Sequence, residues 1–206
     1  MCCSCQFVAI STEYYFTSES DTARQFKWLQ SDLQNANQNR HKTPWIVVYG
    51  HRPPYCSNFS QDDCAREDSI IRLGILQADH TRKYGLEKFL HDTKVDLAVF
   101  GHEHSYERFH PHYAGDSNLP DSKGVYHDPS SPVVVITGAA GGKEEHDAIG
   151  NGIENSAFRS AEYGFGILRV EGDTHLYFEQ RGAESNRAVD SFTIKKKSVA
   201  SPAHSL

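Results

Sequence analysis

Residues 95–104 read VDLAVFGHEH, an apolar run that ends at a glycine and continues into a His-x-His. Residues 45–51 read WIVVYGH, a second apolar run with the same Gly-His ending. Such β-branched runs are typical of strands that helices cover on both faces of a parallel sheet. Ligands of open α/β sheets bind just beyond the carboxyl ends of the strands. We therefore expect His51, His102 and His104 to meet there as half of a metal site.

The spacing of His102 and His104 supports this interpretation. Residues two apart lie on the same face of an extended chain, whereas a helix would direct them to nearly opposite sides. Gly101 is expected to allow the tight bend. A single histidine at a strand end is more often a surface or hydrogen-bonded residue, but two equivalent Gly-His ends favour metal binding. The remaining histidines are expected to face solvent, among them His41, His80, His91 and His110.

The hydrophobic pattern predicts alternating strands and helices in the first half of the chain. Strands are expected at 6–11, 45–51 and 95–100, a helix at 21–37 with Asp21 as its N-cap, and a helical region at 65–91 broken near Gly74 or Gly85. This order implies a parallel sheet with right-handed crossovers.

The pattern changes after residue 110. A long surface loop is expected at 110–131, followed by strands at 132–137, 163–170, 174–180 and 189–195. The small-residue turn at 138–142 lacks the Gly-Lys-Ser/Thr of a phosphate-binding loop. The predicted fold class is α/β, followed by an antiparallel β-rich region and a frayed tail at 196–206.

The bulk properties exclude several classes of protein. The 206-residue chain carries a net charge of -6, with a pI near 6.0, which argues against a nucleic-acid-binding surface. No apolar run approaches the roughly 20 residues of a membrane span. The first ten residues lack the basic and apolar regions of a signal peptide.

The cysteines form two groups. Cys2, Cys3 and Cys5 are expected to lie in a disordered, chemically idle end. Cys56 and Cys64 bracket a short loop and are predicted to form a disulfide, with two free thiols as the alternative. Residues 58–60, Asn-Phe-Ser, form a glycosylation sequon in that loop. Disulfide and sequon both favour a secreted or lysosomal location, although the chain shows no signal peptide.

Two motifs resemble those of a known family. Residues 50–58 read GHRPPYCSN and residues 101–108 read GHEHSYER, which look like the later motifs of the purple acid phosphatases, within the calcineurin-like metallophosphoesterase superfamily. The animal iron/zinc acid phosphatase type 7 branch is the most similar. Supporting stretches lie at 11–13, 25–29, 32–33, 136–141 and 162–166, so the resemblance extends from about Phe7 to Lys195.

The resemblance implies a domain organisation and a reaction. Residues 1–112 would be the C-terminal half of a metallophosphoesterase α/β sandwich, residues 113–195 the purple acid phosphatase C-terminal region, and residues 196–206 a disordered tail. Such enzymes hydrolyse phosphomonoesters at a binuclear centre of Fe(III) and a second divalent ion, which is Fe, Zn or Mn.

The resemblance also assigns ligands. By matching motifs, His51 and His102 would bind the divalent metal and His104 the iron. Arg52 and Arg108 are expected to form structural ion pairs with Glu103 or Glu107 rather than to bind phosphate.

The chain departs from the family in its first motifs. The Gly-Asp-x-x-Tyr and Gly-Asn-His strings, which supply the bridging aspartate, the tyrosine and further ligands, are absent. We therefore expect that the chain begins midway through the catalytic domain and is inactive alone, because two cations without bridging anions repel each other strongly. The alternatives are a non-catalytic metal-binding or interaction module, and a structural α/β domain in which the histidines are not ligands.

Overall fold

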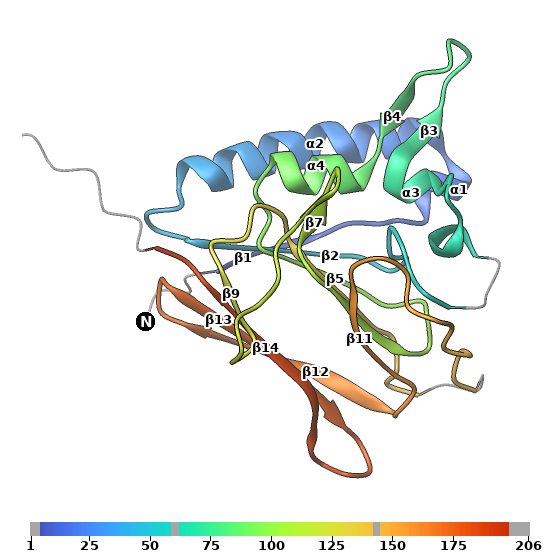
Figure 1. Cartoon of the computed structure of the whole chain (residues 1–206). Helices are drawn as coiled ribbons and strands as arrows, with labels where there is room; N and C mark the ends of the chain where they lie inside the picture. Colours follow the sequence, from blue (N-terminus) through green and yellow to red (C-terminus); the bar gives the residue numbers. More distant parts are fainter. Residues whose placement is uncertain (1–4, 59–61, 142–144, 198–206) are drawn as a thin grey trace, which may run out of the picture.

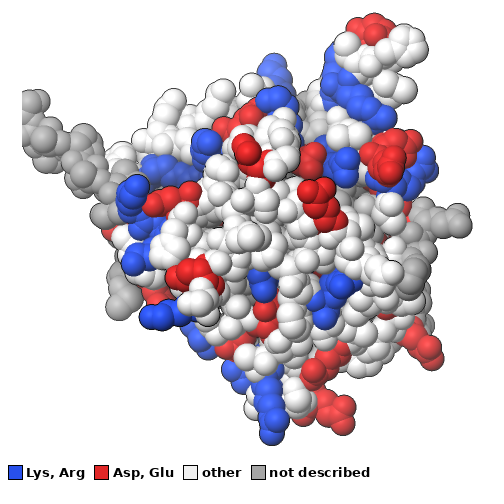
Figure 2. Space-filling view, in the orientation of Figure 1, with Lys and Arg blue, Asp and Glu red and all other residues white. Residues whose placement is uncertain are grey.

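The computed structural model describes residues 5–58, 62–141 and 145–197, which form three layers (Figure 1). Helices cover one face of a six-stranded sheet, and a four-stranded sheet packs against its other face. Within the described residues, no helix is long and apolar enough to cross a membrane. On the face shown in Figure 2, acidic and basic side chains are interspersed and no extended patch carries one sign.

The main sheet is mixed. Its strands, in spatial order, are β1 (Cys5–Ala9), β2 (Trp45–Tyr49), β5 (Leu97–Phe100), β10 (Val133–Thr137), β6 (Tyr106–Phe109) and β11 (Ser156–Ser160). The first four run parallel to one another, whereas β6 and β11 pair in antiparallel fashion. The parallel sheet predicted from the alternating pattern is confirmed. The strands β6 and β11 were not predicted, and the main sheet thus draws strands from both sides of residue 112.

The helices pack on one face. They are α1 (Tyr14–Thr17), α2 (Glu19–Gln38), the 3₁₀ turn η1 (Asp63–Ala65), α3 (Ile70–Leu73) and α4 (Leu86–Asp92). Helix α2 buries Leu29 and Leu33 against the sheet, as its apolar periodicity predicts. Its N-cap is Ser18 rather than Asp21, because the Ser18 hydroxyl accepts the backbone N–H of Asp21.

The prediction of a helical region at 65–91 is wrong for the middle of that range. A projecting hairpin of β3 (Gly74–Leu76) and β4 (Arg82–Tyr84) separates α3 from α4 (Figure 1). Gly74 ends α3 with φ of +96°, and a Cβ there would lie 2.3 Å from the carbonyl oxygen of Lys83. Both breaks suggested by the glycines are therefore present, with strands between them.

The second sheet has the order β12 (Gly164–Glu171), β13 (His175–Gly182), β14 (Ala188–Lys195) and β9 (Val125–His127). The three antiparallel strands predicted after residue 163 are confirmed. The region predicted as a loop at 110–131 holds β9 and the small pair β7 (His112–Tyr113) and β8 (Asp116–Ser117). Strand β9 joins the second sheet parallel to β14, so this loop contributes to the core through Tyr126.

The two ends of the described chain are both anchored. Cys5 is buried in β1, so the expectation of a disordered, idle end is wrong for this residue, while Cys2 and Cys3 lie outside the described residues. Lys196 follows β14, and its ammonium lies 2.5 Å from Asp96 and over the ring of Trp45. Residues 198–206 of the predicted tail lie outside the described residues.

A buried ion pair joins the two sheets. Arg108 on β6 and Asp190 on β14 are 2.7 Å apart, and their side chains are 10% and 7% exposed. The hydroxyl of Tyr106 also donates to Asp190, and Arg108 donates to the hydroxyl of Tyr126. The pKa of Arg108 is raised because the Asp190 carboxylate more than offsets the cost of burial. Asp190, rather than Glu103 or Glu107, is thus the carboxylate that pairs with Arg108.

We expect Asp190→Asn to destabilise the fold by about 3 to 5 kcal/mol, because it leaves the Arg108 charge buried without its counter-ion. Urea unfolding followed by circular dichroism measures this change. Asp92→Asn is the matched control, since it breaks the exposed Lys88–Asp92 pair and should cost less than about 0.5 kcal/mol. Equal effects of the two substitutions would contradict the role given to Asp190.

Candidate metal centre

The carboxyl edge of the parallel strands brings two of the predicted histidines into contact. His51 follows β2 and His102 follows β5, and their rings lie edge to face with centroids 4.9 Å apart. The Nε2 atom of His51 is 3.1 Å from the Nδ1 atom of His102. Of the three imidazoles predicted to meet at this edge, the strands bring His51 and His102 into contact.

The bend at this edge is made by His102 itself. His102 has φ of +67°, a left-handed conformation that is unfavourable for a residue with a Cβ. Gly101, the residue expected to allow the bend, does not adopt a positive φ. Strain of this kind costs about 1 to 3 kcal/mol and is concentrated at functional sites. Here it turns the His102 ring towards His51.

His104 is near enough to His51 to affect its pKa. The pKa of His51 is lowered by burial first, then by His102 and Arg52, and least by His104. Its backbone N–H donates to the carboxylate of Asp147, and its carbonyl oxygen lies 3.3 Å from Nδ1 of His146. The backbone around His104 is thus fixed by residues 146 and 147, which were not singled out in the sequence.

The two contacting imidazoles fit a divalent ion. Zinc binds histidine nitrogen at about 2.0–2.1 Å, so two ligands of one tetrahedral ion lie about 3.3 Å apart. The observed separation of 3.1 Å between His51 Nε2 and His102 Nδ1 is close to this value. The lowered pKa of His51 favours the neutral ring, which is the form that binds metals.

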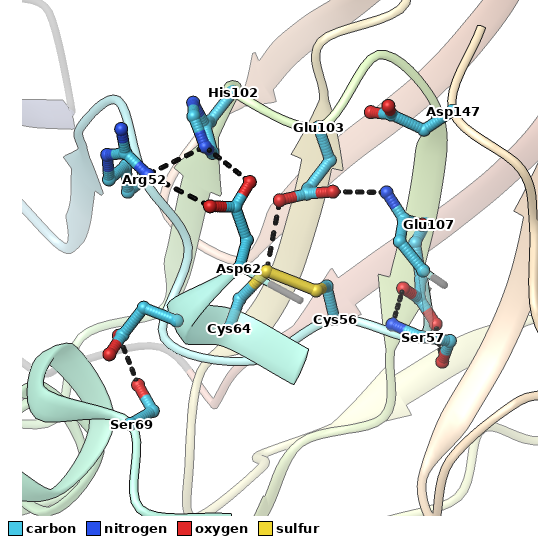
Figure 3. Close-up of a disulfide and its surroundings, with 12 residues drawn as sticks. Arg52, Cys56, Ser57, Asp62, Cys64, Ser69, His102, Glu103, Glu107 and Asp147 are labelled. Carbon is cyan, nitrogen blue, oxygen red and sulfur yellow. Dashed lines mark hydrogen bonds and ion pairs between the residues drawn. A yellow bond between two sulfur atoms is a disulfide. The ribbon is translucent and has the colours of Figure 1, made fainter. Parts of the chain in front are cut away.

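A carboxylate and a guanidinium contact the other nitrogen of His102 (Figure 3). Its Nε2 lies 3.0 Å from Oδ2 of Asp62 and 2.8 Å from Nη1 of Arg52. Arg52 also pairs with Glu13 at 2.9 Å and with Asp62 at 3.5 Å. These are its ion-pair partners, in place of the predicted Glu103 or Glu107. Asp62 was missed, although it lies inside the loop that the cysteine spacing closes.

The predicted disulfide between Cys56 and Cys64 is present and shapes this loop. It excludes both sulfurs as metal ligands, although they lie near the Glu103 carboxylate. Two buried glutamates hold the same segment (Figure 3): Glu107 accepts bonds from the N–H and the hydroxyl of Ser57, and Glu103 accepts one from the side-chain amide of Asn58. Burial raises the pKa of Glu103.

Two histidines that were expected to face solvent are held by hydrogen bonds instead. His91 lies 2.7 Å from the hydroxyl of Ser131, and His110 lies 2.8 Å from the hydroxyl of Tyr126. Burial lowers the pKa of His110. His80 is exposed as predicted.

Two protein-family models match consecutive parts of the chain. The calcineurin-like phosphoesterase model matches residues 7–106, and the iron/zinc purple acid phosphatase-like protein C model matches residues 131–191. The chain belongs to the purple acid phosphatase family.

Individual relatives agree with this assignment. Acid phosphatase type 7 of Danio rerio is 40% identical over 198 residues, which are 92% of this chain and 44% of that protein. The Fe(3+)-Zn(2+) purple acid phosphatase 12 of Arabidopsis thaliana is 29% identical over 168 residues, which are 80% of this chain and 32% of that protein. The chain therefore spans less than half of the length of these relatives.

A solved structure shows the same fold. The purple acid phosphatase from yellow lupin (Lupinus luteus) seeds superposes with a TM-score of 0.70 at 24% identity, covering 94% of this chain and 31% of that one. The predicted α/β metallophosphoesterase fold is thus confirmed. The assignment of His51, His102 and His104 as the metal ligands of this family member stays a prediction.

The asparagine of the sequon is buried and hydrogen-bonded inside the fold. Asn58 is 9% exposed, and its amide nitrogen, the atom that would carry a glycan, donates to the 1%-exposed Glu103. We expect Asn58→Ala to destabilise the chain by about 1 to 3 kcal/mol, because it removes the buried hydrogen bond from the amide to this carboxylate. Thermal unfolding measures the change. Ser60→Ala removes the sequon but keeps the amide, so an equal loss of stability in that variant would contradict the explanation.

Proposed function

We propose that this chain carries the histidine side of the metal centre of a phosphomonoester hydrolase. The observation that carries the proposal is the pairing of His51 Nε2 with His102 Nδ1 at the carboxyl edge of the sheet, at the spacing of two ligands of one ion. Membership of the purple acid phosphatase family supports the reaction class. The relative named as an Fe(3+)-Zn(2+) enzyme supports iron and a second divalent ion, Zn, Mn or Fe.

The residues divide between two ions in this proposal. His51 and His102 hold the divalent ion, and His104 is a ligand of the iron. A bound divalent ion supplies Lewis acidity that stabilises the charge of a phosphoryl group. The chain contributes the imidazoles and a strained backbone at His102 that keeps two of them aligned. Arg52 is paired with Glu13 and Asp62, so its contribution is to hold the surroundings of His102 rather than to bind the phosphate.

We further propose that the chain on its own binds one ion and does not turn over substrate. Two cations a few ångströms apart require anionic ligands between them, and imidazoles bring no negative charge. Among the described residues, the carboxylates grouped with His102 are Asp62 and Glu103. Glu103 is buried and engaged with Asn58, which leaves it poorly placed to bridge two ions.

A secreted or lysosomal location is also proposed. The Cys56–Cys64 disulfide supports it, because such bonds persist in oxidising compartments. The buried sequon contributes nothing to this proposal, since the Asn58 amide is hydrogen-bonded inside the fold.

Zinc titration followed by calorimetry tests the site. We expect one ion per chain, and we expect His51→Ala and His102→Ala each to abolish binding, because each removes one of the two contacting ligand atoms. His80→Ala, at an exposed histidine on the projecting hairpin, is the control and should bind as the unmodified chain does. Unchanged binding by both site variants would exclude this metal site and favour a structural role for the fold.

With iron and zinc added, the isolated chain is expected to leave p-nitrophenyl phosphate intact. Metal binding without hydrolysis matches a chain that cannot complete the two-metal centre, and equally a non-catalytic metal-binding module of the family. Hydrolysis that is lost in His104→Ala would show instead that the chain is active alone.

A further inference from the structure

Asp62 lies beside His102, one of the two contacting histidines (Figure 3). It lies on the loop closed by the Cys56–Cys64 disulfide, outside the strands that carry the histidines. Its Oδ2 atom is 3.0 Å from Nε2 of His102, while Nδ1 of the same ring faces His51. One nitrogen of His102 thus faces the candidate metal position and the other faces a carboxylate.

The two partners of His102 Nε2 require different tautomers. Arg52 can only donate a hydrogen bond, so its contact at 2.8 Å suits a ring whose Nε2 carries a lone pair and whose Nδ1 carries the proton. Asp62 accepts a hydrogen bond, so its contact suits a ring with the proton on Nε2 and the lone pair on Nδ1. Only the second tautomer can bind an ion through Nδ1.

We propose that Asp62 is a positioning residue for His102, a role that rests on the proposed metal site. Its carboxylate accepts the Nε2 proton, which fixes the tautomer and the ring orientation that present the Nδ1 lone pair beside His51. Carboxylates that accept the second ring N–H of a metal-binding histidine act in this way in other metal sites. When the Nε2 proton points to Asp62, Arg52 retains Glu13 and Asp62 as acceptors.

The loop is built to keep Asp62 in place. Cys64, two residues after Asp62 in the chain, is held by the disulfide. The intervening Asp63 accepts hydrogen bonds from the hydroxyl of Ser69 at 2.6 Å and from the N–H of Ile70 at 2.9 Å. Asp62 therefore directly precedes two anchored residues, Asp63 with its hydrogen bonds and Cys64 with its disulfide. This restraint is what a partner needs in order to hold a ligand at fixed geometry.

Zinc affinity, measured by calorimetry on the full chain, tests the role of Asp62. We expect Asp62→Ala to weaken binding by about 10- to 100-fold. Asp62→Asn should recover part of this loss, since its amide oxygen accepts the same proton. Asp68→Ala is the matched control, because Asp68 is an exposed aspartate paired with Arg66 and should leave the affinity unchanged. Thermal unfolding confirms that each variant is folded.

A second readout is the tautomer of His102 in the zinc-loaded chain, observed by long-range ¹H–¹⁵N NMR. The unmodified chain should show the proton on Nε2 with a stable hydrogen bond, and Asp62→Ala should lose that bond signature. If Asp62→Ala binds zinc with unchanged affinity while His51→Ala and His102→Ala lose binding, the positioning role is overturned but the proposed metal site is not. If Asp62→Ala loses zinc binding completely and Asp62→Asn recovers none of it, Asp62 is a direct ligand, which also overturns the positioning role. Unchanged binding in the two histidine variants would instead exclude the metal site itself.

Discussion

The buried pair of Arg108 and Asp190 fixes β6 against the second sheet, and the disulfide loop beside the candidate site depends on that strand. Successive residues of a strand point to opposite faces. While Arg108 reaches Asp190, the preceding Glu107 points the other way and accepts the bonds from Ser57 that hold the start of the disulfide loop. One short strand therefore sets the position of the second sheet on one side and of the loop on the other.

The metal position is built from elements that are rigid for separate reasons. His51 and His102 are placed by the hydrogen-bonded register between β2 and β5, which pairs Val47 with Leu97 through to Tyr49 with Val99. The loop that faces them is restrained by a disulfide and by two buried carboxylates. The unfavourable backbone conformation of His102 persists because the surrounding structure holds the chain in place. Such preorganisation lowers the free-energy cost of ordering ligands when an ion binds.

Much of this arrangement could be predicted from the sequence. The apolar runs that end at His51 and His102 indicated parallel strands, and the topology of such sheets brings their carboxyl ends together. The cysteine spacing predicted the disulfide. Strand β6 was not predicted, because Glu107 and Arg108 look like surface residues until Ser57 and Asp190 are known to lie beside them. The role of Asp62 was not predicted for a similar reason. Asp62 and His102 are forty residues apart in sequence, and their contact depends on how the loop folds back.

The burial of Asn58 limits when a glycan can be attached to its sequon. A glycan can be attached to this amide only while the amide is accessible, and the packed loop encloses it against Glu103. A sugar fixed there would occupy the amide nitrogen that donates to Glu103 in the packed fold. Occupancy at Asn58 would therefore record a chain that was modified before this segment packed.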